Sequence, residues 1–211
     1  MAVLHIFAVT RNRSICASTL HTMMNLHMLC MLRGTHIEIH FVDDMAGLSK
    51  IIKTGERLFW MDYGTNLNQE ILHKVLDPFE RGVQIMVFPA VREGIDWDCF
   101  EKKTKAGTKE PVEQRGLNFD TIPGKKLAPG LYESVSTSAR VWVMDAKPVD
   151  KKLRGTKVPT KLQTGSPGEM FAHLSSLGLK IGVASEAAVI CHYVHECFGN
   201  ILEAAGVELG P

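Results

Sequence analysis

Polar residues follow three apolar segments in the first third of the chain, and their types suit the binding of a nucleoside diphosphate. They are Thr10, Arg11 and Arg13 after segment 3–9, Asp43 and Asp44 after segment 36–42, and Asp62 at the end of segment 57–62. Guanidinium groups bind phosphate oxygens, and a carboxylate accepts hydrogen bonds from a ribose hydroxyl or a base N–H. Asp62 could also hold a divalent cation, which would bridge to pyrophosphate oxygens and offset the charge of a leaving group. Chemistry on a nucleotide-linked sugar requires this set of groups.

The same residues have a simpler structural interpretation. A strand-end aspartate often only caps the following helix, and an arginine in a turn is often solvated. Because three successive segment ends carry such groups, the functional interpretation gains weight over the structural one.

The segments that must position these residues alternate between strand and helix patterns. Strands are predicted at 3–9, 36–42, 57–62 and 83–91, and helices at 15–33 and 68–81. That alternation predicts an α/β fold, with a central, mostly parallel mixed sheet flanked by helices. Ligands of such sheets bind beyond the carboxyl ends of the strands, so the three polar groups should line one cleft. The methionine-rich stripe of 15–33 is expected to lie in the core.

The second half of the chain has a weaker pattern. We expect a long loop region over 92–130 with a short helix near 96–105, strands at 131–136, 140–145 and 179–184, a basic loop over 147–168, and helices at 168–177 and 186–206. The expected organisation is one domain over 1–211, with a nucleotide-binding half at 1–91 and an acceptor and catalytic half at 92–211. The alternative, that the chain is the N-terminal part of a longer protein, stays open.

Composition and charge argue against several classes of partner and location. The 24 Lys and Arg residues nearly balance the 23 Asp and Glu residues, so no nucleic-acid partner is expected. The five cysteines form no CxxC pair, which favours reduced thiols. No signal peptide or membrane-length apolar stretch is visible, so we expect a cytoplasmic protein. The oligomeric state stays open.

Several familiar motifs are absent from the sequence. It contains no GxxxxGK[ST] phosphate loop, no GxGxxG after the first strand and no GxSxG nucleophile elbow. The pair His192 and His195 has the order HxxHE rather than HExxH and lies among apolar residues, which disfavours a zinc site there.

Four segments resemble, in the same order, those of GT-A glycosyltransferases of the large inverting family. VLHIFAVTRNR resembles the opening strand, which is followed by TYNR in that family, and IEIHFVDD is similar to its IIVVDDGS element. LFWMDYGTNL resembles the strand that carries the metal-binding DxD, and GEMFAHLSSLGLKIGVASEAAVICH is similar to the late segment with an acidic pair and a histidine. The stretches VREGIDWDCF, EPVEQRGLNFDT, RVWVMDAKPV and HECFGNILEAAGV resemble a glycosyltransferase domain encoded by large algal (chlorella) viruses.

This resemblance implies a GT-A fold, a UDP-sugar donor such as UDP-glucose, Mn²⁺ or Mg²⁺, and a capsid glycan as acceptor, assembled in the host cytoplasm. It implies that Thr10, Arg11 and Arg13 contact uridine or phosphate, Asp43 or Asp44 contacts uracil or ribose, Asp62 and His192 ligate the metal, and Glu169 is the catalytic base. It also favours inversion at the anomeric carbon.

The sequence departs from the family pattern at both acidic motifs. The DxD counterpart, Asp62-Tyr63-Gly64, lacks the second carboxylate, and the literal DxD, Asp96-Trp97-Asp98, comes several residues after the fourth strand. Glu169 lacks an acidic neighbour, so the base could be another carboxylate. The candidates are Asp98, Asp120 and Asp145. Helix capping is the alternative role for the aspartates at 96 and 98.

Two rival functions stay open. A nucleotidyltransferase also uses an α/β sheet and metal-bound phosphates, but it would need a Gly-rich, Lys-containing signature that TRNRSICAS lacks. A non-catalytic nucleotide- or glycan-binding module is favoured by the incomplete acidic motifs.

Overall fold

The computed structural model describes residues 3–191 except 46, 93, 95, 111, 113, 114, 155–165 and 188. Within them, eight strands form one sheet in the order β2-β1-β3-β8-β5-β9-β7-β6. The strands are β1 Val3–Val9, β2 His36–Val42, β3 Arg57–Met61, β5 Ile85–Phe88, β6 Thr121–Ala128, β7 Leu131–Thr137, β8 Val141–Asp145 and β9 Ile181–Ala184. β1 is parallel to β2 and β3, β5 is parallel to β9, and β8 is antiparallel to β3 and β5. This mixed α/β sheet confirms the predicted fold class. The expectation that the sheet is mostly parallel needs correction, because four of its seven strand pairs within the described residues are antiparallel.

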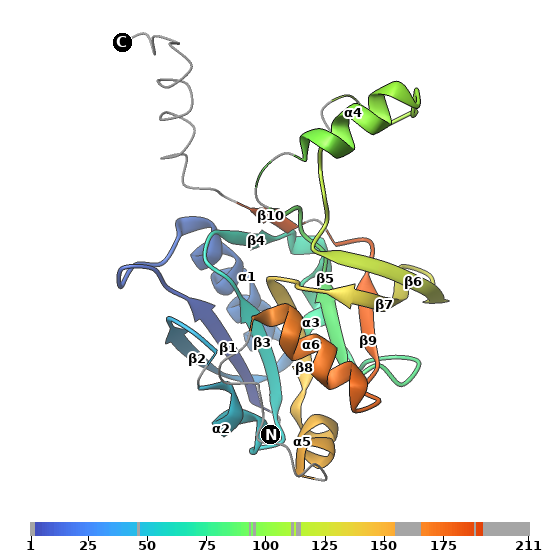
Figure 1. Cartoon of the computed structure of the whole chain (residues 1–211). Helices are drawn as coiled ribbons and strands as arrows, with labels where there is room; N and C mark the ends of the chain where they lie inside the picture. Colours follow the sequence, from blue (N-terminus) through green and yellow to red (C-terminus); the bar gives the residue numbers. More distant parts are fainter. Residues whose placement is uncertain are drawn as a thin grey trace, which may run out of the picture.

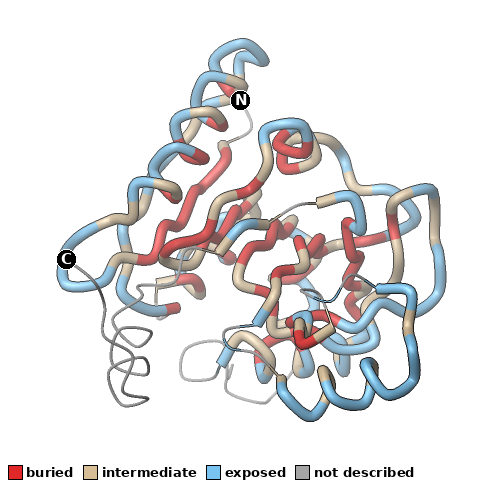
Figure 2. The backbone as a smooth tube through the Cα atoms, turned by 90° about the horizontal axis from the view of Figure 1, so that it is seen from above, coloured by how far each residue is buried: buried red, intermediate tan, exposed pale blue. Residues whose placement is uncertain are grey.

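Helices cover both faces of the sheet (Figure 1). They are α1 Ala17–Arg33, α2 Leu48–Ile52, the 3-10 helix η1 Gln69–Ile71, α3 His73–Leu76, α5 Ala146–Arg154 and α6 Pro167–Ser176. Because side chains alternate between faces along a strand, Ile6 of β1 packs in a cluster with α1 and α3, while Phe7 packs in a cluster with α2, α5 and α6. Figure 2 shows the buried backbone concentrated on the central strands. No helix in the described part of the chain is long and apolar enough to span a membrane.

Helix α1 buries only part of its methionine-rich stripe. Met23 and Leu26 are buried against the sheet, whereas Met24, Met28 and Met31 are more than half exposed. Apolar residues occur around much of this helix, but only one of its faces can contact the sheet. The expectation that the whole stripe lies in the core is therefore wrong for the three exposed methionines.

Cys16 and Cys30, near the two ends of α1, should differ in reactivity toward alkylating reagents. Burial raises the pKa of Cys30 to about 11, whereas a hydrogen bond with Ser18 lowers the pKa of Cys16. Since the thiolate is the nucleophile, iodoacetamide should label Cys16 well before Cys30 in the folded chain. Peptide mass spectrometry measures the two rates, and the urea-unfolded chain, in which the rates should converge, is the control. Equal rates in the folded chain would contradict the packing of α1.

Three expectations for the second half of the chain need correction. Residues 146–154 form helix α5 rather than a loop, because Ala146 and Val149 are buried while the lysines around them face solvent. Strand β6 lies within the expected loop region. Val189–Cys191 form β10, antiparallel to β4 (Thr65–Leu67), within the expected helix 186–206, and residues 192–206 lie outside the described part. Helix α4 (Trp97–Lys105) agrees with the short helix expected near 96–105.

Candidate functional site

The carboxyl ends of β1, β2 and β3 meet at one edge of the sheet. Thr10 Oγ1 donates a hydrogen bond to Asp43 Oδ1 at 2.7 Å, which joins the end of β1 to that of β2. The Arg11 guanidinium lies over the Tyr63 ring, 5.1 Å from its centroid, which joins the end of β1 to that of β3. Asp44 is exposed beside Asp43. The structure thus brings the three polar strand ends together.

A tight turn holds Arg11 and Arg13 beyond the end of β1. Arg11 and Ser14 exchange two backbone hydrogen bonds of 3.1 and 2.9 Å, and Ser14 Oγ donates to the Arg11 carbonyl at 2.8 Å. Asn12 and Arg13, at φ 51° and 60°, lie in the left-handed region that a two-residue hairpin turn requires. The turn leaves both guanidinium groups exposed to solvent, where an anionic ligand could reach them.

The backbone fixes Asp62 directly after β3. Its N–H donates to the Arg140 carbonyl at 3.0 Å, and its Oδ1 accepts the Tyr63 N–H at 2.7 Å. Gly64, at φ 72°, allows the chain to turn from β3 into β4, where Thr65 Oγ1 donates to the Asp62 carbonyl at 2.6 Å. The hydrogen bond from the Tyr63 N–H engages Oδ1, so Oδ2 is the carboxylate oxygen with which Asp62 could bind a ligand.

Two residues that sequence reasoning missed complete this edge of the sheet. Arg140 precedes β8, and Cys191 ends β10. Burial raises the pKa of the Cys191 thiol, the charge and hydrogen bond of Arg140 oppose this, and the charges of Asp120 and Asp62 add to the rise. The geometry agrees: the Asp62 N–H bonds to the Arg140 carbonyl, and Cys191 pairs with Thr65, which follows Asp62 by three residues. No motif signals Arg140, because its position depends on β8 running antiparallel between β3 and β5.

Asp120 is the one aspartate or glutamate of the described residues that is almost fully buried, with 4% of its surface exposed. Its Oδ1 accepts hydrogen bonds from the Ala90 N–H at 3.1 Å and the Thr121 hydroxyl at 2.8 Å, while its buried Oδ2 has no partner within the described part. Burial raises the pKa of Asp120, and its hydrogen bonds and the Arg140 charge oppose that rise.

Replacing Asp120 with asparagine should change how stability depends on pH. Because the pKa of Asp120 is raised in the folded chain, the folded chain binds this proton more tightly than the unfolded chain. The resulting stabilisation is present at acid pH and is lost as the pH rises through the raised pKa. Asp120→Asn keeps an acceptor oxygen without the charge. As the pH rises through the raised pKa, the unfolding free energy of the variant should therefore increase relative to that of the parent chain. Denaturant unfolding across the pH range measures the gain, and Asp98→Asn, on an exposed side chain, is the control. A gain that does not vary with pH would contradict the buried charge.

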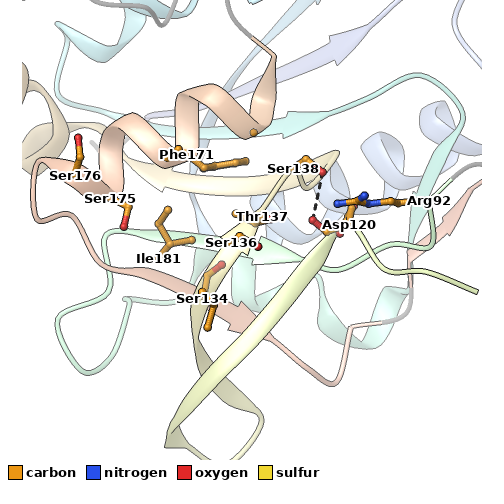
Figure 3. Close-up of a pocket in the computed structure, with 13 residues that line it drawn as sticks. Arg92, Asp120, Ser134, Ser136, Thr137, Ser138, Phe171, Ser175, Ser176 and Ile181 are labelled. Carbon is orange, nitrogen blue, oxygen red and sulfur yellow. Dashed lines mark hydrogen bonds between the residues drawn. The ribbon is translucent and has the colours of Figure 1, made fainter. Parts of the chain in front are cut away.

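A pocket of about 580 Å³ opens beside Asp120, between β7 and α6 (Figure 3). Hydroxyl groups line much of it, from Ser134, Ser136, Thr137, Ser138, Ser175 and Ser176. Arg92 and Asp120 lie at one end, and Phe171 and Ile181 add apolar surface. A lining of hydroxyl groups with one cation and one carboxylate suits a polar, hydroxyl-bearing ligand.

Glu169 lies in the first turn of α6, with an exposed side chain. Its N–H donates to Ser166 Oγ, which caps the helix. The preceding residue, Gly168, is packed against the segment before β8: a Cβ added there would lie 3.5 Å from the Cβ of Ser138. Glu169 therefore belongs to the same end of the sheet as Arg140 and Asp62.

Asp98 lies in the first turn of α4, which stands out from the body of the molecule beyond β4 and β10 (Figure 1). Asp96 caps this helix by accepting the Cys99 N–H at 2.8 Å, as the capping alternative predicts. The structure thus does not bring Asp98 together with the strand-end residues, and its catalytic role stays a prediction.

Two further candidates have different outcomes. Asp145 lies at the opposite edge of the sheet, because β8 runs antiparallel to β3, and there it accepts a hydrogen bond from Arg57 Nε at 2.7 Å. This position removes Asp145 from the candidate bases. His192 lies outside the described residues; Cys191, before it in the chain, pairs with Thr65.

No protein-family model matches the chain, and no curated protein matches it either. Among solved structures, it is similar to the viral protein A197 from STIV, with a TM-score of 0.52 and 11% identity over 92% of this chain and 86% of that chain. It is also similar to a putative glucose-1-phosphate thymidylyltransferase from Bacillus anthracis in complex with a sucrose, with a TM-score of 0.50 and 8% identity over 100% and 97%. A third structure, GalNAc-T7 with UDP, GalNAc and Mn²⁺, has a TM-score of 0.48 at 10% identity over 91% of this chain and 44% of that chain.

At these identities the similarities concern the fold alone. The structure has a large mixed sheet with helices on both faces. The two similarities with the higher TM-scores indicate the same type of fold. The chain has a GT-A-like fold.

Proposed function

We propose that the chain is a metal-dependent glycosyltransferase that moves a hexose from a UDP-sugar to a glycan acceptor. The observation that carries the proposal is the meeting of three strand ends, where Thr10 bonds to Asp43 and Arg11 lies over Tyr63, the residue after Asp62. Guanidinium and carboxylate groups thereby lie together at the carboxyl ends of parallel strands, where α/β folds bind nucleotides.

The residues at Asp62 fit a hard divalent cation that the substrate helps to hold. Such ions are usually bound through one or two carboxylates and complete their coordination with substrate phosphates and water. Asp62 offers one carboxylate oxygen, and the family resemblance adds His192. When bound, the cation would offset the charge that develops on the departing diphosphate.

The proposed reaction is a displacement at the anomeric carbon. The acceptor hydroxyl oxygen forms the new bond, the bond from that carbon to the diphosphate oxygen breaks, and UDP leaves with the electron pair. The acceptor proton passes to a carboxylate base. Glu169 and Asp98 are the predicted bases, and Asp120, which lines the pocket, is the third candidate.

The remaining residues would hold the donor in place. Arg11 and Arg13 would bind the departing diphosphate through charge-assisted hydrogen bonds. Asp43, oriented by Thr10, and its neighbour Asp44 would accept hydrogen bonds from uracil or ribose. The hydroxyl-lined pocket of about 580 Å³ would take the acceptor sugar. The resemblance to domains of large algal viruses supports a capsid-protein glycan as acceptor, in the host cytoplasm.

A nucleotidyltransferase is the second candidate, because the similarity to the thymidylyltransferase fold covers 97% of that chain. The connection from β1 to α1 argues against it. Residues 10–16 hold a short hydrogen-bonded turn instead of a Gly-rich loop with a lysine.

A panel of UDP-sugars, assayed for UDP release with Mn²⁺ and with EDTA, tests the proposal. Release that requires the metal and increases with a glycan acceptor supports the glycosyltransferase. Pyrophosphate release from a nucleoside triphosphate and glucose 1-phosphate supports the nucleotidyltransferase instead. Metal-dependent UDP binding with neither reaction supports a non-catalytic module and overturns the proposal.

A further inference from the structure

Two histidines and a glutamate converge on β1 and β2, away from the candidate cleft. His5 Nδ1 lies 3.0 Å from His40 Nε2 and 3.4 Å from Glu38 Oε2, and the last two atoms are 4.0 Å apart. The strand register pairs His5 with Glu38 and Phe7 with His40, so the three side chains project from the same face of the sheet. The convergence therefore follows from the fold of the two strands.

The ring of His5 is fixed as a metal-binding histidine usually is. Its side chain is 4% exposed, and its Nε2 lies 2.6 Å from Glu56 Oε2, in the residue before β3. A carboxylate that holds one ring nitrogen sets the tautomer and turns the other nitrogen toward a metal. Here that other nitrogen, Nδ1, faces His40 and Glu38.

The three facing atoms have the separations of ligands around one ion. Ligand atoms about 2.0–2.1 Å from a tetrahedral zinc ion are about 3.3 Å from one another. The observed separations of 3.0, 3.4 and 4.0 Å lie around that value. We propose that His5, Glu38 and His40 bind a zinc ion. Two imidazoles and one carboxylate suit Zn²⁺ better than Mg²⁺ or Mn²⁺, which prefer oxygen ligands.

This site is independent of the cation proposed at Asp62. His5 precedes Val9, at the end of β1, by four residues, about 13 Å along an extended strand. An ion there would join the edge strand β2 to β1, and through Glu56 to the start of β3. The half-exposed Glu38 and the His40 side chain, 28% exposed, give the ion access from solvent.

The test is a zinc titration of the full chain after removal of metal with a chelator, read by competition with a chromophoric indicator. The expected result is one zinc ion per chain, with a higher unfolding temperature. His40→Ala and Glu38→Gln should each weaken zinc affinity by about 10-fold or more. Because Glu38 is half exposed, its variant keeps the proposal testable if His40→Ala fails to fold.

His36→Ala and Asp62→Asn are the matched controls. His36 is an exposed histidine on the same strand and Asp62 belongs to the other proposed site, so both variants should bind zinc as the parent chain does. Cobalt in place of zinc should give the visible absorption of a tetrahedral nitrogen and oxygen site. Zinc affinity equal in the parent chain and the Glu38 and His40 variants, or no zinc binding at all, would overturn the proposal and leave the three side chains as a hydrogen-bonded cluster. Loss of zinc binding in Asp62→Asn would overturn the independence of the two sites.

Discussion

Replacing Asp62 with asparagine should lower metal-dependent UDP release by about 100-fold or more. A bound metal ion supplies several kcal/mol of charge stabilisation, which is lost with the ligand that holds the ion, and each 1.36 kcal/mol is about tenfold in rate. The fold should survive the change. Asparagine keeps an oxygen that can accept the Tyr63 N–H, and the Asp62 backbone bonds to Arg140 and Thr65 are unaffected. UDP release at saturating Mn²⁺, with the unfolding temperature measured beside it, is the readout.

Glu80→Gln is the matched control for Asp62→Asn. Glu80 is an exposed carboxylate in the turn that precedes β5, at the opposite edge of the sheet. Its variant should release UDP at the parent rate. If Asp62→Asn kept the parent rate and the parent dependence on Mn²⁺, Asp62 would not be the metal ligand.

Trp142→Ala should cost about 3–5 kcal/mol of unfolding free energy, the range for removing a large aromatic side chain from a core. Trp142 is fully buried in β8, which joins the two parallel parts of the sheet. Its ring stacks on Trp60 at 5.9 Å between centroids and meets Phe171 of α6 edge-on at 5.8 Å. The alanine variant would lose contacts to a neighbouring strand and a helix at once.

Two further variants make the Trp142 prediction specific. Trp142→Phe should cost less, because it keeps an aromatic ring and removes a buried Nε1–H that has no partner among the described residues. Trp97→Ala, on a residue of α4 that is 67% exposed, should have little effect. Urea unfolding measures all three. A loss for Trp142→Ala no larger than that for Trp97→Ala would contradict the position of β8 in the core.

The strand-end argument could be made from the sequence because parallel strands present their carboxyl ends at one edge. The apolar segments 3–9, 36–42 and 57–62 correspond to β1, β2 and β3, and the polar residues after them do meet. Short-range patterns were sufficient here, since each strand is continuous and apolar and is bounded by turn residues.

The same argument fails for Asp145 and Arg140, because their positions depend on the direction in which β8 runs. The sequence predicts a strand at 140–145, but its partners β3 and β5 lie about 80 and 55 residues earlier in the chain, and nothing local says that it runs antiparallel to them. That direction places Asp145 at the opposite edge of the sheet and places Arg140 beside Asp62. Helix α5 was not predicted for a different reason. Only two of its residues, Ala146 and Val149, are buried, and most of the others are charged, so the segment shows no clear apolar periodicity.

Calorimetric titration of UDP into the chain, with Mn²⁺ and then with EDTA, tests the proposed cation and diphosphate site most directly. The structure-based expectation is binding of UDP that is at least about tenfold tighter with Mn²⁺, a difference of about 1.4 kcal/mol, and that loses this gain in Asp62→Asn. GDP and CMP should bind more weakly than UDP. Equal UDP affinity with Mn²⁺ and with EDTA, or no UDP binding in either, would contradict a metal-assisted nucleotide site at the ends of β1, β2 and β3.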